Sequence, residues 1–456
     1  MAANRICPTP YLSKMWRAEL APGGNIKLGF IGLGKLGLPV AIAITQKGHE
    51  VYGCDVNQSL LSDYKNGVVS LYEPDIANQL KEALPHLHLG GAGEYLSIRD
   101  VVRESEIIFI AVQTPHPPEL DGSVRFHHVR KDFDYTYLVQ AAKDVAEAIK
   151  ETENYKVVAI ISTVLPGTTW NTIYPAMYNI IREPPGRKWG LCYNPSFIAM
   201  GQTINNFLYP EITLIGQWVG DDKSAGILED FYNTLHGAPK LRMTWEEAEM
   251  VKVVYNTFIG LKIVLANTVM EFCHKTGADC DVVSHALSLA TDRLISPKYL
   301  RGGMGDGGAC HPRDALALSY HSDKLGLSYN LFDMVMTVRE KQTEWIADLA
   351  CEHGPTLPKV ILGRTFKPDT NLVDGSCSVL LANILRERGE EVIFYDPVTD
   401  TTLPPYQPSV YIIGTNWPEF KSFKFAPGSV VIDPWRYIDE APYDVELISV
   451  GRRTWC

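Results

Sequence analysis

A glycine-rich turn between a strand and a helix constrains the fold of this chain more than any other feature of its sequence. The segment Gly32-Leu33-Gly34-Lys35-Leu36-Gly37 follows an apolar run over residues 27–31 and opens a helical stretch over residues 36–47. In such a turn the first glycine permits the sharp bend, the second lets a pyrophosphate approach the backbone, and the third lets helix and strand pack closely. The helix N-terminus also presents free N–H groups and a positive dipole end to phosphates. The segment therefore predicts a dinucleotide-binding turn.

An acidic residue at the end of the next strand indicates which dinucleotide binds. Asp55 ends the strand predicted over residues 50–54, about 20 residues beyond the turn, where a carboxylate accepts hydrogen bonds from the adenosine ribose hydroxyls. A carboxylate there repels the 2′-phosphate of NADP, so we predict NAD as the cofactor. The alternative is that the glycines only shape a tight turn in an α/β protein, but the strand, the helix and Asp55 together favour a cofactor site.

Strand and helix signals alternate at both ends of the chain. Apolar runs over residues 107–112 and 157–161 flank a helical stretch over 137–149, and alternation returns from residue 359 onwards. Continuous apolar strands separated by helices indicate parallel sheets covered on both faces. Between these regions, the stretch from Trp245 to about Lys275 has no proline and one glycine, which predicts one long helix that spans between domains or forms a dimer core.

Composition and charge exclude several classes of protein. A chain of 456 residues is too long for one ordinary domain, and its formal net charge of −11 argues against nucleic-acid or anionic-membrane binding. No run of about 20 apolar residues predicts a membrane span, and the N-terminus lacks the apolar core of a signal peptide. The nine cysteines are scattered and none forms a CxxC pair. We therefore expect a cytoplasmic protein with neither a disulfide framework nor a metal site.

A second glycine-rich segment carries the candidate chemistry. Residues 302–309 contain five glycines and deliver Cys310, and Asp314 follows four positions later. If Cys310 begins a helix, the dipole favours its thiolate, and Asp314 lies one turn along on the same face. The alternative is a buried cysteine beside a flexible loop.

Two further segments place polar side chains where they can serve a site. Lys252 and Asn256 form an i, i+4 pair among apolar neighbours on the long helix. A lysine in such a setting either reaches out to solvent or acts as a buried ammonium. Residues 162–169 follow a buried strand, so their hydroxyls, including that of Thr163, lie at a carboxyl edge of the sheet, where α/β sheets bind ligands.

Taken in order, these motifs resemble the UDP-glucose/GDP-mannose dehydrogenase family. The likeness covers residues 26 to about 440. It is carried by the glycine-rich turn with Asp55, Thr114-Pro115, Ser162–Thr169, Asn194-Pro195, the Lys252 and Asn256 pair, Gly303–Asp314 and Gly363–Thr370.

The resemblance implies an α/β fold in which two Rossmann-like doubly wound domains are joined by a central all-helical domain with a long connecting helix. The expected limits are an N-terminal extension over residues 1–24, an NAD-binding domain over 25–220, a helical dimerisation domain over 221–350 and a nucleotide-sugar-binding domain over 351–456. The expected assembly is a homodimer.

The resemblance also implies an activity, namely oxidation of a sugar CH2OH to a carboxylate with two NAD per turnover, on a UDP-hexose similar to UDP-glucose. Asp314 and a water would accept the hydroxyl proton, while Lys252 and Asn256 would stabilise the oxyanion. Cys310 would form a thiohemiacetal and then a thioester, and Thr163 would help to hold the catalytic water.

The binding residues are implied in the same way. Cofactor contacts fall on Gly32, Gly34, Leu36, Gly37, Asp55, Thr114 and Thr163. Substrate contacts fall on Asn194, Ser196, Lys252, Asn256, Arg293 (acting from a partner subunit), Tyr299, Gly307, Phe366 and Lys367.

The chain departs from the family pattern at positions that would contact the sugar and nucleotide. Ser196 and Met200 stand where the family carries two glutamates, and the first of these glutamates is credited with activating water against the thioester. Asp306 replaces an aromatic residue of the glycine-rich loop, His311 follows the cysteine, and residues 373–376 replace an Arg-Glu-Ser sequence. The cofactor half of the pattern is intact.

Three hypotheses therefore stand. The enzyme makes the uronic acid, with Asp314, His311 or Thr163 replacing the missing glutamate; or it takes an unusual substrate or stops at a partly oxidised stage; or it binds a nucleotide sugar without catalysis. The retained Cys310 and Lys252 count against the third, because a binding protein needs neither.

Overall fold

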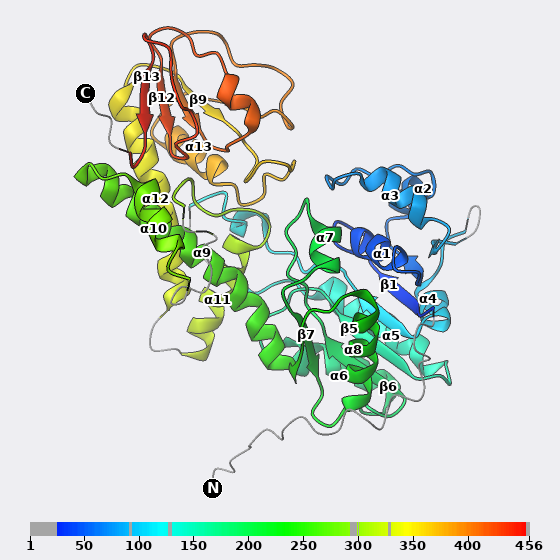
Figure 1. Cartoon of the computed structure of the whole chain (residues 1–456). Coiled ribbons are helices and arrows are strands. Elements are labelled where there is room, and N and C mark those ends of the chain that lie inside the picture. The colour runs from blue at the N-terminus through cyan, green and yellow to red at the C-terminus, as the bar shows by residue number, and fades with distance from the viewer. Residues whose placement is uncertain are drawn as a thin grey trace. The chain divides into compact units, whose positions relative to one another are not determined.

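The computed structural model describes residues 25–90, 94–125, 130–291, 299, 301–326 and 330–452. The expected extension over residues 1–24 lies outside this range. The described chain forms two compact units (Figure 1). Unit 1 contains the described residues up to 114 together with 135–249, and unit 2 contains 115–134 and the described residues from 250 onwards.

Unit 1 is built on an eight-stranded sheet with the order β3-β2-β1-β4-β5-β6-β7-β8. The first six strands are parallel and follow the 3-2-1-4-5-6 order of dinucleotide-binding folds. β7 runs antiparallel to β6, and β8 is parallel to β7. The strands are β1 (Lys27–Ile31), β2 (Glu50–Cys54), β3 (Leu87–His88), β4 (Ile107–Ile110), β5 (Lys156–Ile160), β6 (Trp189–Tyr193), β7 (Thr213–Gln217) and β8 (Lys240–Thr244).

Helices cover both faces of this sheet, as its almost entirely buried central strands require. α1 and α8 pack with one core cluster, and α4, α5 and α6 with the other. The helices of unit 1 are α1 (Gly37–Thr45), α2 (Gln58–Lys65), α3 (Ile76–Ala83), α4 (Ile98–Glu104), α5 (Thr136–Lys150), the short π-helix η2 (Thr169–Ile173), α6 (Tyr174–Ile181), α7 (Thr203–Leu208) and α8 (Asp222–Leu235).

The first sheet extends further along the chain than the limit we expected at residue 220. α8 and β8 carry it to Thr244, where α9 (Trp245–Thr276) begins directly. α9 is the long helix predicted from Trp245 to about Lys275. Helix α8 contributes Leu228 and Phe231 to the core of unit 1, so residues 221–244 belong to the α/β part and not to the helical region.

Unit 2 contains a second, five-stranded parallel sheet with the order β10-β9-β11-β12-β13. This 2-1-3-4-5 order is the other common doubly wound arrangement. The two sheets bear out the predicted α/β fold class, with a helical region between them in the sequence. The elements of this part are β9 (Lys359–Leu362), α13 (Cys377–Glu387), β10 (Val392–Tyr395), β11 (Val410–Ile413), the 3-10 helix η3 (Pro418–Ser422), β12 (Val430–Asp433) and β13 (Glu446–Ser449).

The two faces of the second sheet are covered differently. α12 (Leu331–His353) and α13 pack on one face through an aliphatic core. The other face is covered by η3 and the loops around it, whose aromatic side chains replace a second helical layer; Trp417, Phe420 and Phe425 are all buried there.

The helical part of unit 2 consists of α9 from residue 250 onwards, α10 (Cys280–Ser288), α11 (His311–Leu325) and α12. α9 is long and apolar enough to cross a membrane by length and composition only, although 47% of its most apolar window is buried within the protein. This is weak evidence for a membrane span, because a buried core helix meets the same criteria.

The segment 115–134 belongs to unit 2, although its sequence position lies within the expected first domain. Polar contacts explain this placement. Arg125 forms ion pairs with Glu344 of α12 and Glu387 of α13, and Ser123 accepts a hydrogen bond from Asn383 at 2.7 Å between oxygen and nitrogen.

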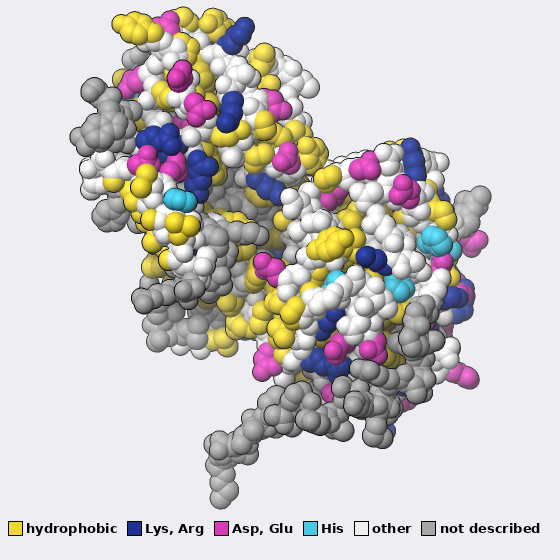
Figure 2. Space-filling view, in the orientation of Figure 1, with side chains coloured by type: hydrophobic (Ala, Val, Ile, Leu, Met, Phe, Trp, Pro, Cys, Tyr) yellow, Lys and Arg dark blue, Asp and Glu magenta, His cyan; other side chains and the backbone are white. Residues whose placement is uncertain are grey.

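On the face shown in Figure 2, basic and acidic side chains are interspersed, and the residues described there form no broad basic surface.

Phe420→Ala is expected to lower the free energy of unfolding of unit 2 by about 3–5 kcal/mol, because the ring is fully buried and its removal leaves a cavity. Urea denaturation followed by tryptophan fluorescence measures the loss. Tyr443→Ala is the matched control, since Tyr443 is fully exposed. Equal stability of the two variants would contradict the assignment of the aromatic layer as a core.

Candidate active site

The glycine-rich turn of unit 1 has the geometry of a phosphate cradle. Gly32 has φ +96°, and a Cβ there would lie 2.8 Å from the Ala111 carbonyl oxygen. A Cβ on Gly37 would lie 2.0 Å from the Gly32 carbonyl oxygen, so this glycine is required for the close contact between turn and helix. A Cβ on Gly34 would meet no protein atom within 4 Å. Gly34 is thus the position that leaves open space for a ligand.

The N-terminus of α1 is available to an anion. Leu36 is the N-cap residue, and no side chain makes a capping hydrogen bond to this helix end. The first turn of α1 carries no acidic residue. The Leu38 N–H donates to the Gly34 carbonyl at 3.2 Å and Pro39 has no N–H, so it is mainly the positive dipole end that suits this end of the helix to a phosphate.

Asp55 follows β2 and fastens the turn to the neighbouring strand. Its Oδ2 accepts a hydrogen bond from the Leu33 N–H at 2.8 Å, and its Oδ1 accepts one from the Asn57 N–H at 2.8 Å. The carboxylate thus has a fixed position beside the turn. Each carboxylate oxygen has a second acceptor site, so these bonds leave capacity for ribose hydroxyls.

Thr114 and Thr163 lie together at the carboxyl edge of the first sheet. The Thr114 hydroxyl donates to the Thr163 carbonyl at 2.8 Å, which connects the segments that follow β4 and β5. Ser162 makes a parallel connection by donating to the Val112 carbonyl at 2.6 Å. The structure therefore brings these two predicted cofactor contacts together at the edge where such sheets bind ligands.

Glu249 is a buried residue of this region that sequence reasoning missed. Glu249 is fully buried and accepts hydrogen bonds from the N–H groups of Gly167 and Thr169 at 2.6 and 2.7 Å. Burial raises the pKa of Glu249 to about 7, against the opposing effect of these hydrogen bonds. The side chain fixes the loop that contains Thr163.

Unit 2 brings together four of the predicted catalytic residues. Cys310 is the N-cap of α11, and Asp314 lies one turn along with its N–H donating to the Cys310 carbonyl at 2.8 Å. Asn256 of α9 donates from Nδ2 to Asp314 Oδ2 at 2.6 Å. Arg313 donates to Asp314 Oδ1 at 3.0 and 3.1 Å. The Asp314 carboxylate, which has no exposed surface, is thereby fixed on both oxygens.

Lys252 completes this cluster from one turn earlier on α9. Its side chain is buried. Burial lowers the pKa of Lys252, and the nearby Cys310 and Asp314 oppose that shift. Of the two alternatives left open by the sequence, Lys252 is therefore the buried one, and it interacts electrostatically with Cys310 and Asp314. Among the seven described cysteines, only Cys310 and Cys351 are partly exposed, so the thiol in this cluster is accessible while most others are packing residues.

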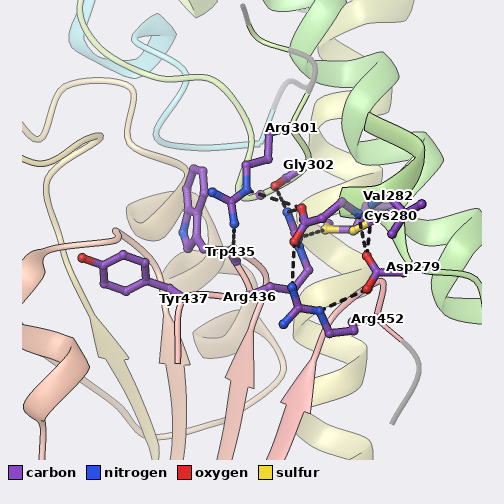
Figure 3. Close-up of polar contacts among 12 residues, drawn as sticks. Asp279, Cys280, Val282, Arg301, Gly302, Trp435, Arg436, Tyr437 and Arg452 are labelled. Atoms are coloured by element: carbon purple, nitrogen blue, oxygen red, sulfur yellow. Dashed lines mark hydrogen bonds and ion pairs between the residues drawn. The ribbon is translucent and has the colours of Figure 1, made fainter. Parts of the chain in front are cut away.

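A buried arginine, Arg436, binds the first residue of the glycine-rich loop that leads to Cys310. Arg436 donates from Nη2 to the Gly302 carbonyl at 2.6 Å (Figure 3). It also pairs with Asp281 of α10 at 3.1 Å. Arg301 and Arg452 surround the same carboxylate at 3.4 and 3.2 Å. This network joins the start of the loop to α10 and to the C-terminal strands.

A second buried arginine, which sequence reasoning also missed, holds the middle of the loop. Arg339 of α12 pairs with Asp306 at 2.7 Å between Nε and Oδ1 and donates to the Asp306 carbonyl. It also donates to the carbonyls of Gly122 and Gly375 at 2.9 and 2.7 Å. One guanidinium therefore connects three loops. The acidic residue at position 306, in place of an aromatic one, was the signal that a buried cation would be needed.

Predicted substrate contacts also meet in unit 2. A Cβ on Gly307 would lie 2.8 Å from the Phe366 Cβ, so the loop and the segment after β9 touch closely. The Lys367 ammonium lies 5.7 Å from the centre of the Phe366 ring. Tyr299 is 46% exposed and has φ +64°. Arg293 lies outside the described residues.

The remaining predicted substrate contacts lie in unit 1. Asn194 is buried after β6, where its Nδ2 donates to the Leu214 carbonyl at 2.7 Å and its Oδ1 accepts from the Tyr232 hydroxyl at 2.6 Å. This amide therefore braces β6, β7 and α8. Ser196 is half-buried in the loop that follows. Substrate contact stays a prediction for both residues.

Two family models match this chain. The model of the UDP-glucose/GDP-mannose dehydrogenase family, NAD binding domain, matches residues 26–236. The model of the central domain of the same family matches residues 246–341.

Individual proteins match over most of the chain. UDP-glucose 6-dehydrogenase TuaD of Bacillus subtilis is 29% identical over 87% of this chain and 85% of its own length. GDP-mannose 6-dehydrogenase of Pseudomonas aeruginosa is 28% identical over 81% of each chain. Among solved structures, a UDP-glucose dehydrogenase from Pyrobaculum islandicum has a TM-score of 0.82 and 30% identity, covering 95% of this chain and 100% of its own.

Gly34→Ala is expected to leave the free energy of unfolding within about 1 kcal/mol of the wild type, because the new methyl group meets no protein atom. NAD binding should weaken about tenfold or more, since the methyl would occupy the approach path of the pyrophosphate. Isothermal calorimetry and urea denaturation measure the two quantities. Gly37→Ala should instead lose stability, since its Cβ would clash with Gly32. Unchanged NAD affinity in the Gly34 variant would refute this assignment of the cradle.

Proposed function

Because this chain belongs to the UDP-glucose/GDP-mannose dehydrogenase family, we propose that it oxidises the 6-CH2OH group of a UDP-hexose similar to UDP-glucose to the uronic acid through covalent intermediates on Cys310. Its class is that of an NAD-dependent nucleotide-sugar dehydrogenase. The observation that carries the proposal is a cluster at the start of α11, where the partly exposed Cys310 is the N-cap residue and Asn256 donates to the buried Asp314 one turn along. Buried Lys252 interacts electrostatically with both Cys310 and Asp314.

The residues of unit 1 fit the cofactor. The open space at Gly34, the uncapped N-terminus of α1 and the fixed carboxylate of Asp55 suit a pyrophosphate followed by a ribose. Thr114 and Thr163 mark the carboxyl edge of the same sheet. NAD, when bound, supplies the hydride acceptor for both oxidations.

In the first oxidation the protein has to remove a proton and stabilise an oxyanion. Asp314, with a water, accepts the hydroxyl proton; the hydrogen bonds from Asn256 and Arg313 keep its carboxylate in place. Lys252 and Asn256 stabilise the alkoxide, and such donors contribute on the order of 3 kcal/mol each in a desolvated site.

In the second oxidation Cys310 holds the substrate. Its Sγ adds to the aldehyde carbon to give a thiohemiacetal, which is oxidised to a thioester. Lys252, whose pKa is lowered by burial while Cys310 and Asp314 oppose that shift, is the cation that we assign to stabilise both the thiolate and the oxyanion. Hydrolysis of the thioester then releases the acid.

A second candidate function follows from Ser196, which stands where the family carries a glutamate. A chain without an effective base for hydrolysis would stop at the thioester. A change at a position that would contact the substrate could instead mean that the enzyme acts on another nucleotide sugar, which the resemblance to a GDP-mannose 6-dehydrogenase supports. A nucleotide-sugar-binding protein without catalysis is the third candidate, which the retained Lys252 and Cys310 disfavour.

The exposed side of α9 supports the proposal that two copies of the chain form a homodimer. Met250, Val254, Phe258 and Leu265 are each at least 40% exposed. Their spacing places them along one side of the helix, while Lys252 and Asn256 are buried on another. A continuous apolar stripe on a long helix is typical of a protein–protein interface.

Cys310→Ala is expected to abolish formation of the acid, lowering kcat by roughly 10³-fold or more, because no covalent intermediate can form. NADH absorbance with UDP-glucose, other UDP-hexoses and GDP-mannose measures the reaction. The wild type should yield two NADH per sugar. NAD affinity should not change, and Cys351→Ala, at the other partly exposed cysteine, should retain full activity.

Each other outcome has a definite meaning. One NADH per sugar from the wild type would favour partial oxidation, and binding without NADH would favour a non-catalytic protein. Two NADH per sugar from the Cys310 variant at the wild-type rate would exclude the covalent scheme.

Leu265→Glu is expected to weaken the dimer by about 2 kcal/mol or more, because it places a charge in the apolar stripe. Sedimentation equilibrium measures the dissociation constant. Leu403→Glu changes a similarly exposed leucine away from α9 and should leave the dimer intact. A monomeric wild type would refute the homodimer.

A further inference from the structure

We propose that His311, positioned by Asp306, is the base that activates water for hydrolysis of the Cys310 thioester. This inference rests on the proposed function and assigns the step for which Ser196 offers no carboxylate. Its starting point is that two departures from the family pattern, an acid at position 306 and a histidine at position 311, face each other in the folded protein.

The side chains of His311 and Asp306 lie opposite each other at the start of α11. His311 is the first residue of α11, directly after Cys310. Its Nδ1 lies 4.0 Å from Asp306 Oδ2, and its side chain is 21% exposed while that of Asp306 is 4% exposed. This distance is longer than a direct hydrogen bond, but the carboxylate favours the proton on the facing Nδ1. Nε2 then carries the lone pair and can act as the base.

Asp306 is held in place from two sides. Arg339 binds its Oδ1 at 2.7 Å, which leaves Oδ2 to face His311. On α9, a Cβ on Gly260 would lie 2.9 Å from Oδ2, so the absence of a side chain there gives the carboxylate its room. A charged, fixed acid behind a histidine is the arrangement that orients an imidazole for proton transfer.

The electrostatic surroundings keep His311 in its neutral, basic form. Burial lowers the pKa of His311, and Lys252 and Arg339 lower it further. Asp306 and Asp314 act in the opposite direction. A histidine that is neutral near pH 7 can take a proton from water, as the step requires.

The other candidate bases are less suited to the task. Asp314 already takes the hydroxyl proton in the first oxidation, and its side chain is fully buried, whereas that of His311 is 21% exposed to the solvent that supplies the hydrolytic water. Thr163 offers a hydroxyl, which is too weakly basic to deprotonate water at neutral pH. His311 combines partial exposure, a position beside Cys310 and a carboxylate partner.

The step balances without any further reactant. The water oxygen forms a bond with the acyl carbon, and its proton passes to His311 Nε2. The carbon–sulfur bond then breaks, and its electron pair stays on Cys310 Sγ as a thiolate beside Lys252. The proton on His311 returns to that thiolate or leaves to solvent, and nothing is oxidised or reduced.

The test follows the first turnover of His311→Phe and His311→Gln after rapid mixing with NAD and UDP-glucose, or with whichever nucleotide sugar the substrate panel identifies. Both variants should retain a burst of two NADH per active site and then turn over about 10²–10⁴-fold more slowly than wild type, the usual contribution of a general base. Acid-quenched intact-protein mass spectrometry should find the uronyl group on Cys310. Hydroxylamine, which attacks thioesters without a base, should restore turnover.

A matched control and a positioning variant sharpen the test. His321→Gln changes another histidine of α11 and should behave as wild type. Asp306→Asn should shift the acid limb of the hydrolysis rate to lower pH, because it removes a charge that raises the pKa of His311. A purely structural role of Asp306 would not move this limb.

The outcomes separate this inference from the proposed function. If the wild type gives no NADH with any nucleotide sugar, both the proposed function and the role of His311 are refuted. If the wild type makes the acid but both His311 variants hydrolyse the thioester at its rate, only the role of His311 is overturned. Loss of the burst in both variants would also overturn it, since His311 would then act before the thioester forms.

Discussion

The buried ion pair between Arg339 and Asp306 is the interaction on which the glycine-rich loop of unit 2 depends. Five of the seven residues from Gly302 to Gly308 are glycines, and ordering such a segment costs more conformational entropy than ordering any other kind. Arg339 offsets this cost by binding the loop at Asp306 and joining it to two other loops. Removing either partner would leave an uncompensated buried charge, which typically costs about 3–5 kcal/mol. The position of Cys310 is therefore set by a cation on another helix.

Much of the fold was predictable from sequence because its signals are local. Buried parallel strands are continuous apolar runs, so the strands over residues 27–31 and 50–54 were predicted at their observed limits. The α9 helix was predicted because it lacks helix-breaking residues. The extent of the first sheet was not, because β8 is a partly exposed edge strand whose Lys240 and Arg242 do not resemble a buried strand.

The candidate site likewise contains residues that the sequence predicts and residues that only the folded structure reveals. The backbone geometry of the turn requires glycine at positions 32 and 37, and Gly34 leaves open space for a ligand, so the spacing of these glycines in the sequence predicts their roles. Arg339 binds Asp306, 33 positions away, and Glu249 binds residues 80 and 82 positions away, and only the folded chain shows such partners. Asn194 also has partners that only the folded chain shows, the Leu214 carbonyl and the Tyr232 hydroxyl, and its contact with substrate stays a prediction.

The assignment of residues 115–134 to unit 2 has a consequence for how the gene can be divided. The polypeptide passes from one unit to the other near residues 114, 134 and 249. Each unit therefore consists of two separate stretches of the sequence. A single truncation cannot release either half intact. A fragment ending at residue 249 would carry Arg125 without Glu344 and Glu387, and the complementary fragment would lack the carbonyl of Gly122 that Arg339 binds. A single recombination event within the gene therefore cannot exchange one complete unit for that of a related protein.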